Sequence, residues 1–291
     1  AAVPQLEPAY QELLRQAAQG EVVYNDDTTV KILARTGKRA LAAQKISLET
    51  LAHETGGSPA SERKGTFTSG VISVRDGQRI ALFLSGPRHA GENLQEVLRH
   101  RAAELGPPIQ MCDALSRNVP RELETILAHC LAHARRQFVE VHEQFPAECR
   151  YVLEALRVIY RNDALARERQ LSPEGRLAFH QIDSGPPLEQ LYVWLKRQFD
   201  ERLVEPNSGL GRAISYLRKH WQQLTLFLRQ AGAPLDNNVC ERALKKAILH
   251  RKNALFYKTQ HGADVGDLYL SLIHTCELCG VSPFNYLTQL Q

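Results

Sequence analysis

The chain has 291 residues, a hydrophobic share of 43% and a formal net charge of +4. This length suits one large domain or two small ones, and the hydrophobic share is ordinary for a folded core. No apolar run approaches the ~20 residues that cross a bilayer, and the first residues lack the basic-then-apolar pattern of a signal peptide. We therefore expect a cytoplasmic protein that does not enter a membrane.

The six cysteines are scattered along the chain. In a chain of this length such scatter does not predict a disulfide framework. Cys276-Glu-Leu-Cys279 is a single CxxC with no second pair beside it. This motif allows a zinc site, but we favour the interpretation that the two cysteines are simply small buried residues on one face of a helix.

The positive charge is concentrated toward the C-terminus. Between Asp236 and Lys258 there are six basic and two acidic residues, so this segment alone has the excess of +4 found in the whole chain. Local clustering of basic residues is typical of proteins that bind a polyanion. A solvated helix face gives the same pattern, and charge alone does not decide between the two.

Short β-prone runs dominate the first third of the chain. The first is Val22-Val23-Tyr24, and two more cover residues 71–74 and 79–84. Asp76-Gly77 separates the latter two, and an Asp-Gly pair between β-prone runs predicts a two-residue hairpin turn because that turn needs positive φ. We interpret the polar stretch from Thr36 to Thr66 as an insertion or a long loop.

A helix and a fourth strand follow the hairpin. Residues 91–104 place apolar side chains on one face at helical spacing, and Gly106-Pro107-Pro108 ends the pattern. Residues 109–112 form a short apolar run that ends at Asp113. The predicted order is therefore strand, hairpin, helix, strand, which indicates an α/β fold with a mixed sheet.

The middle of the chain, residues 119–232, is predicted to be mostly helical. Apolar side chains from Leu123 to Val141 recur at helical spacing, and residues 151–169 continue in the same way. Ser172-Pro173 is typical of a helix start. The segment from Asp183 to Pro187 is a break, and two further amphipathic helices are expected over 188–203 and 210–230.

Three acidic residues occupy positions at which a site could form. Asp26 follows the first predicted strand and Asp113 follows the fourth, and side chains at strand ends gather at sites in α/β proteins. Glu241 opens a helix after Leu235-Asp-Asn-Asn238. A structural interpretation is also available: Asn238 with Glu241 three residues later resembles a capping box, and acids are common in turns.

Six segments together carry a resemblance to a known family. The sequence resembles the insertion-sequence-66 family of bacterial transposases, which belongs to the superfamily with a ribonuclease H-like core and an Asp-Asp-Glu triad. The segments are residues 25–30 (NDDTTV), 110–118 (QMCDALSRN), 130–138 (CLAHARRQF), 235–244 (LDNNVCERAL), 251–256 (RKNALF) and 280–286 (GVSPFNY).

The resemblance implies a ribonuclease H-like mixed sheet flanked by helices and interrupted by a mostly α-helical insertion. The expected organisation is a first core part at 1–118, the insertion at 119–232, and a last core part with C-terminal helices at 233–291. Two departures are visible: many relatives have Gly-Tyr after the second acid, where this chain has Ala114-Leu115, and the insertion after the first strand is long.

The resemblance also implies a site. Asp26, Asp113 and Glu241 would be the catalytic and metal-binding triad, holding two Mg²⁺ ions, with Mn²⁺ as an alternative. Hard cations of this kind take oxygen ligands, and a pair of them clamps both oxygens of a phosphoryl displacement. The residues expected to contact DNA are Arg135, Arg136, Asn237, Asn238, Arg242, Lys245, Arg251, Lys252 and Asn253.

The implied function is cleavage of transposon ends and their transfer to a target. Double-stranded DNA would be the partner, with a homo-oligomer assembled on it, accessory proteins as further partners, and a nucleoid-associated location in the bacterial cytoplasm. A nuclease or resolvase without strand transfer, and an inactive DNA-binding remnant, are alternatives. His129 and His133, expected one helical turn apart, allow a metal pair, although their neighbours Arg135 and Arg136 favour phosphate contact.

Overall fold

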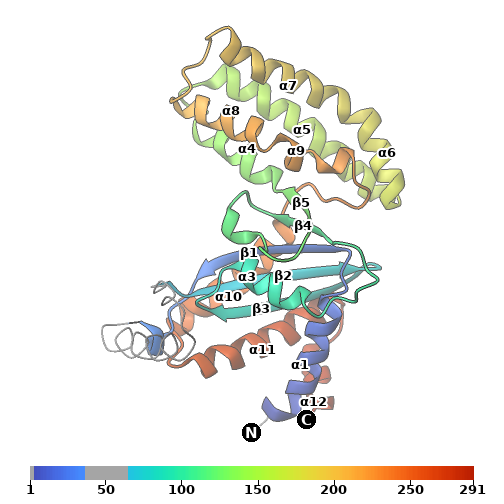
Figure 1. The fold of residues 1–291 in the computed structure, drawn as a ribbon, viewed down its shortest axis with the longest axis vertical. Coiled ribbons are helices and arrows are strands. Elements are labelled where there is room, and N and C mark those ends of the chain that lie inside the picture. Colours follow the sequence, from blue (N-terminus) through green and yellow to red (C-terminus); the bar gives the residue numbers. More distant parts are fainter. Residues whose placement is uncertain (1–2, 37–64) are drawn as a thin grey trace. The chain divides into compact units, whose positions relative to one another are not determined.

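The computed structural model describes residues 3–36 and 65–291, which form two compact units (Figure 1). Residues up to 108, 115–125 and 239–291 belong to the first unit, and residues 109–114 and 126–238 belong to the second. The polar stretch predicted as a loop over 36–66 lies almost entirely outside the described residues. Within the described part, no helix combines the length and the apolar character needed to cross a membrane.

The first unit is built on three antiparallel strands, β1 (Val22–Thr29), β2 (Phe67–Arg75) and β3 (Gln78–Gly86). The predicted hairpin is confirmed: Asp76 and Gly77 connect β2 to β3 with φ of 49° and 77°. Strand β1 is longer than predicted, because it extends through Asn25, Asp26 and Asp27 to Thr29. The expectation that Asp26 follows the strand is therefore wrong, and Asp26 lies inside it.

The second unit contributes two parallel strands, β4 (Ile109–Cys112) and β5 (Ile126–His129). The hydrogen-bonded order of the five strands is β3-β2-β1-β4-β5, which makes the sheet mixed. The predicted α/β class with a mixed sheet is confirmed. The helix expected through residues 126–129 is wrong, because these residues pair with 109–112 as a strand, and a short apolar run cannot be assigned by periodicity alone.

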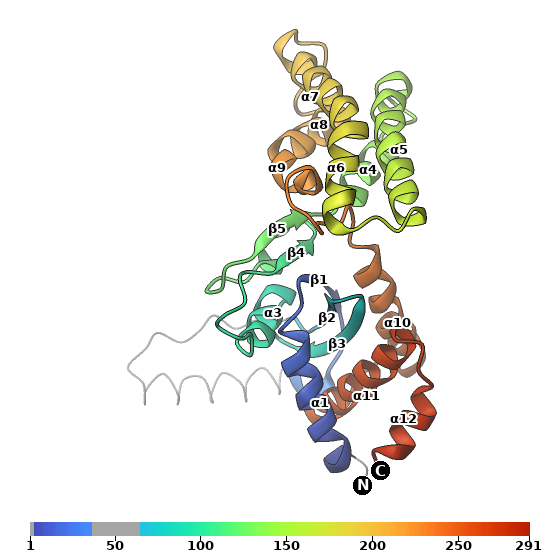
Figure 2. The same cartoon turned by 90° about the vertical axis from the view of Figure 1, so that its right-hand side faces the viewer.

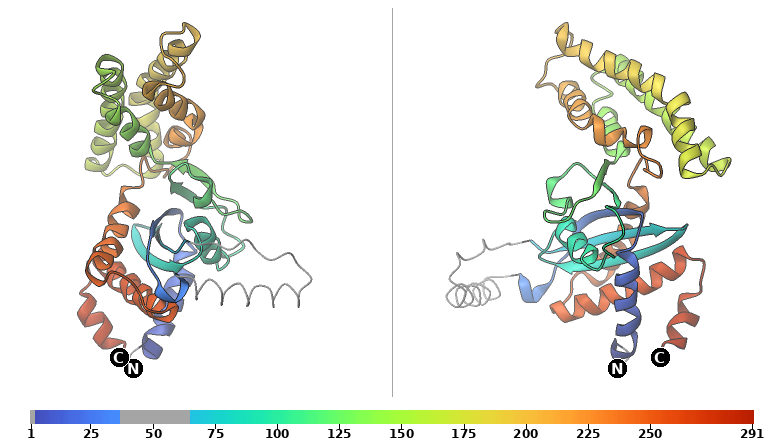
Figure 3. Two further views of the ribbon diagram at one scale, coloured as in Figure 1. Left: turned by 90° about the vertical axis from the view of Figure 1, so that its left-hand side faces the viewer. Right: turned by 45° about the vertical axis from the view of Figure 1, so that its right-hand side comes forward.

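Helices lie on both faces of the three antiparallel strands. On one face, α1 (Val3–Ala17) and α3 (Ala90–Leu98) pack against Val23, Val71 and Leu82. On the other, α10 (Asn238–Ala254) packs against Ile72, Ala81 and Phe83. Two views from opposite sides show α3 and α10 separated by the sheet (Figure 2; Figure 3). Helix α3 ends six residues before the predicted end at 104, and α1 was not predicted.

The second unit is otherwise helical. Ser172 accepts a hydrogen bond from the N–H of Gly175 at 3.1 Å, which confirms the predicted helix start. The single helix expected over 210–230 is wrong, since His220 and Thr225 leave helical geometry. The elements are α4 (Leu131–Glu140), α5 (Pro146–Glu168), α6 (Pro173–Asp183), α7 (Gly185–Asp200), α8 (Gly209–Lys219), α9 (Trp221–Leu224) and the 3-10 turn η3 (Leu226–Leu228).

Helix α11 (Gln260–Leu278) covers the outer edge of β3, and α12 (Pro283–Gln289) follows it. The backbone N–H groups of Ser85, Phe83 and Ala81 donate to side chains of α11, at 2.5, 2.9 and 3.0 Å. The acceptors, Asp267, Ser271 and Thr275, are four residues apart. Four helical residues rise about 6 Å, and two strand residues rise about 6.7 Å. The spacing of the acceptors along α11 therefore nearly equals the spacing of the donors along β3.

The carboxyl group of Asp267 is buried in this interface. Its two oxygens contact the N–H and the hydroxyl of Ser85, and that hydroxyl also contacts Thr68. Burial raises the pKa of Asp267 from 3.8 to about 7, against the hydrogen bonds from Ser85, which lower it. The proton is therefore bound more tightly in the folded chain than in the unfolded one, and the first unit loses stability as the pH rises through this range.

We predict that Asp267→Asn removes much of this pH dependence. The amide keeps the acceptor for the Ser85 N–H and presents a donor to its hydroxyl, so it imitates the protonated acid. Wild-type stability should fall by roughly 4 kcal/mol between pH 4 and pH 8 through this group, and urea titrations across that range should show a much flatter profile for the variant. Asp76→Asn, in the exposed hairpin turn, is the control. Parallel profiles for wild type and Asp267→Asn would contradict the prediction.

Candidate functional site

The position of Asp26 is set by the register of β1 and β2. Asp26 lies directly opposite Gly70, and residues opposite each other in an antiparallel pair point to the same face. Gly70 faces α10: a Cβ there would lie 3.1 Å from Leu244 and 3.3 Å from the sulfur of Cys240. The Asp26 side chain is therefore on the face of the sheet that α10 covers.

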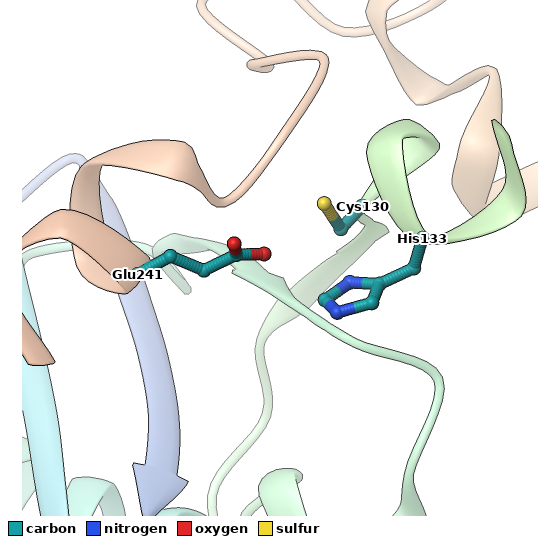
Figure 4. A group of neighbouring side chains, drawn as sticks. All are labelled: Cys130, His133 and Glu241. Atoms are coloured by element: carbon teal, nitrogen blue, oxygen red, sulfur yellow. The ribbon is translucent and has the colours of Figure 1, made fainter. Parts of the chain in front are cut away.

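Glycine at position 70 allows α10 to approach the sheet closely. The Cys240 thiol donates to the carbonyl oxygen of Gly70 at 3.4 Å, so the first turn of the helix rests on the β2 backbone. Glu241 is the next residue, and its side chain extends from this turn (Figure 4). It is partly buried, and its Oε1 atom is inaccessible to solvent. Asp26 and Glu241 thus come from neighbouring elements on one face of the first unit.

The start of α10 does not form the capping box that the sequence allowed. Asn238 is the first helical residue, so Glu241 is the fourth rather than the third. Asp236 accepts the N–H of Asn238 at 3.1 Å and its side-chain amide at 2.8 Å. Capping by Asn238 therefore does not account for Glu241.

The neighbouring acids Asp26 and Asp27 have different surroundings. Asp27 points to the opposite face, as strand alternation requires, and its side chain is 2% exposed. It contacts His89 Nδ1 at 2.8 Å and Arg117 at 3.4 Å, which anchors the start of α3 and the turn η2 (Ser116–Asn118). Asp26 Oδ1 accepts the N–H of Asp27 at 2.8 Å and the amide of Asn118 at 3.3 Å, so its orientation is fixed.

Asp113 directly follows β4 in the second unit, as predicted. Its carboxylate acts on Tyr216: burial raises the pKa of Tyr216 to about 12, and the Asp113 charge contributes less strongly in the same direction. His129 ends the adjacent strand, and its ring lies 5.0 Å from that of His220. Burial, with a smaller contribution from His220, lowers the pKa of His129 to about 4, so this imidazole is neutral at physiological pH.

His129 and His133 do not form the expected pair on one helix. His129 belongs to β5. His133, which Figure 4 labels, lies in the first turn of α4. Cys130, between the two elements, accepts the N–H of Asn237 at 3.2 Å, and burial raises the pKa of its thiol to about 11. The thiol is therefore protonated near neutral pH, and its evident role is to hold the segment that leads to α10.

The residues expected to contact DNA differ in exposure. Arg251 is partly buried and donates to the backbone and hydroxyl of Thr29, so it also ties α10 to the end of β1. Asn237 is fully buried, and Asn238 is partly buried. The exposed residues of the predicted set are Arg135, Arg136, Arg242, Lys245, Lys252 and Asn253.

The structure brings two of the three predicted acids to one face of the first unit and places the third in the second unit. Convergence of all three stays a prediction. Two residues of the site were not singled out in the sequence: Gly70, which admits α10, and Asn118, which holds Asp26. A glycine inside a strand is the one signal that could have pointed to a close backbone approach.

Comparison with known protein families agrees with the expected resemblance to a transposase family. The family model described as "Transposase IS66 family" matches residues 1–265. The chain belongs to this family. Two similar proteins from Sinorhizobium fredii are named only as uncharacterized: y4jD, 28% identical over 289 residues, and y4hP, 35% identical over 174 residues.

The coverage of these relatives is partial. The match covers 98% of this chain but 52% of y4jD, and 56% of this chain but 31% of y4hP. The chain therefore spans about half the length of y4jD and less of y4hP. No solved structure matches the chain.

We predict that Gly70→Ala destabilises the first unit by about 1–3 kcal/mol, because the added methyl group would lie closer than ordinary contact to Leu244 and Cys240, and these buried side chains of α10 would have to shift. Denaturant titration measures the loss. Gly86→Ala is the matched control, since it also lies in a strand and its methyl group would meet Gln260 at an ordinary 3.8 Å. Equal stability of the two variants would contradict the close approach.

We also predict that Asp27→Asn lowers stability, whereas Asp26→Asn does not. The first substitution weakens the contacts to His89 and Arg117 on a nearly inaccessible carboxylate and should cost about 1–3 kcal/mol. The second changes a partly buried group on the opposite face. Thermal melts of the two variants, side by side, measure the difference, and a larger loss for Asp26→Asn would reverse these assignments.

Proposed function

We propose a transposase-type function for this chain, which its membership of the IS66 family supports. We propose that the chain is the catalytic part of such an enzyme, and that it cuts DNA phosphodiester bonds and joins the resulting ends to a target. The observation that carries this proposal is the arrangement of Asp26 and Glu241. The register of β1 and the close approach of α10 at Gly70 present both carboxylates on one face of the same unit.

Asp26, Asp113 and Glu241 are proposed as the ligands of two Mg²⁺ ions, which Mn²⁺ could replace. The donor set fits, because these hard cations prefer carboxylate oxygens, and Asp26 is held in one orientation by Asn118 and the N–H of Asp27. When bound, such a pair supplies Lewis acidity and a nucleophile from water or a 3′-hydroxyl. A mixed sheet with helices on both faces supports a ribonuclease H-like core as the scaffold.

The remaining residues of the proposed site bind and orient the substrate. Exposed Arg242, Lys245 and Lys252 line the outer side of α10 and are proposed to contact phosphates of double-stranded DNA. The proposed triad contains no serine or cysteine that could act as a covalent nucleophile. The proposed role of the protein is therefore to position the reacting groups and to balance their charge. Assembly of several copies on DNA, accessory proteins and a place at the nucleoid belong to the same proposal.

We predict that Glu241→Gln abolishes metal-dependent DNA cleavage while the fold and DNA binding are kept. The neutral amide has the size of the acid but lacks the charge that holds a hard cation. Cleavage in Mg²⁺ should fall at least about 100-fold, the upper end of what the loss of a merely supporting residue costs at a metal site. A nicking assay on transposon-end DNA, together with a thermal melt, measures both properties.

Glu277→Gln is the matched control. Glu277 also contacts α10, through an ion pair with Lys246, but it has no place in the proposed site. This variant should cleave like the wild type. Near wild-type cleavage by Glu241→Gln would remove Glu241 from the site. A strand-transfer assay with the wild type then separates a transposase from a nuclease or resolvase, and complete inactivity would indicate a DNA-binding remnant.

A further inference from the structure

A basic groove lies within the second unit, on the side of α4 and α5. It encloses about 870 Å³ and is hollowed between side chains of the two helices and Asn238. Four arginines line it against a single glutamate, Glu154. The arginines are Arg135 and Arg136 from α4, and Arg150 and Arg157 from α5.

The two helices contribute the same pattern of positions to the groove. On α5 the lining residues begin at Arg150 and recur at intervals of three or four up to Tyr160, and on α4 and its extension they do so from Ala132 to His142. Such intervals select one face of a helix. Each helix therefore turns to the groove one face that contains two arginines, while its other face supplies the core residues Phe138 and Leu156.

These arginines differ from others in the same unit. Arg167 and Arg176 pair with Asp163, and Arg197 pairs with Glu201. Within the part of the chain that the structure describes, no carboxylate forms an ion pair with Arg135, Arg150 or Arg157, and all three are exposed. The positive charge of these three arginines is thus collected on a concave surface without an ion-pair partner among the described residues.

We propose that this groove binds the sugar-phosphate backbone of DNA without reading base sequence. The choice of DNA as the polyanion rests on the proposed function. Guanidinium groups suit phosphate oxygens because their fixed fork donates two parallel hydrogen bonds. Arg150 and Arg157 are separated by about 10 Å along the helix, roughly three nucleotides at 3.4 Å per step, so they would reach different phosphates of one strand.

The lining also favours backbone contact over contact with bases. Bases without sequence preference are usually held by exposed aromatic rings on which they stack. The only aromatic ring of the lining other than histidine is Tyr160, whose hydroxyl is buried, so that it forms part of the floor. Arg135 and Arg136 were already expected to contact DNA, and the structure adds Arg150, Arg157 and the groove that joins them.

The test is the salt dependence of DNA binding by the full chain. Fluorescence anisotropy with a labelled 30-base-pair duplex, in EDTA and at several salt concentrations, gives the slope of log affinity against log salt. Arg150→Ala with Arg157→Ala should reduce this slope by about 2 and weaken binding roughly tenfold or more at low salt, because each lost phosphate contact removes ~0.9 of slope. Circular dichroism checks that the helices are kept.

Lys196→Ala with Arg212→Ala is the matched control. It removes the same charge from exposed positions on α7 and α8 outside the groove, and it should leave the slope unchanged. An unchanged slope in the groove variant, or an equal fall in both variants, would overturn the proposal. So would equally strong competition by a poly-glutamate peptide. EDTA keeps this result separate from cleavage, so the groove can fail while the Glu241 experiment succeeds.

Discussion

The contact between α10 and the β2 backbone at Gly70 is the constraint on which the proposed site depends. A side chain at this position would crowd α10, because its Cβ would lie only 3.1 Å from Leu244 and 3.3 Å from the sulfur of Cys240. Antiparallel register then fixes what lies beside the contact: Asp26 is opposite Gly70, and Glu241 follows Cys240. A slip of one residue in this pairing would exchange the faces of Asp26 and Asp27.

The opposite face shows why such a slip is disfavoured. Asp27 is committed to the start of α3 and to η2 through His89 and Arg117, and Asn25 donates to the carbonyl of Asn118 at 2.7 Å. Asn25 and Asp27 therefore hold β1 in register through contacts on one face of the sheet, and the Asp26 side chain lies on the other face, which α10 covers. The run of polar residues from Asn25 to Asp27 is thus explained by contacts on both faces of the sheet.

The parts of the fold that the sequence predicted are those determined locally. The Asp76-Gly77 turn, the strand that ends at Cys112 and the Ser172 helix start each depend on a few adjacent residues. Strand β5 and the extension of β1 through Asp26 depend on partners distant in the sequence, and asparagine and aspartate are poor strand formers. The acids were selected by family resemblance, whereas Gly70 and Asn118 became apparent only from their contacts in three dimensions.

The side chains of α11 also limit how this protein can associate with others. The outer strand of a sheet normally offers a row of backbone donors to any extended peptide. On β3 the N–H groups of Ala81, Phe83 and Ser85 are already engaged by a helix, which presents no comparable row of its own. An extended segment of another molecule, including a second copy of the chain, therefore cannot pair with β3 along this edge without displacing α11.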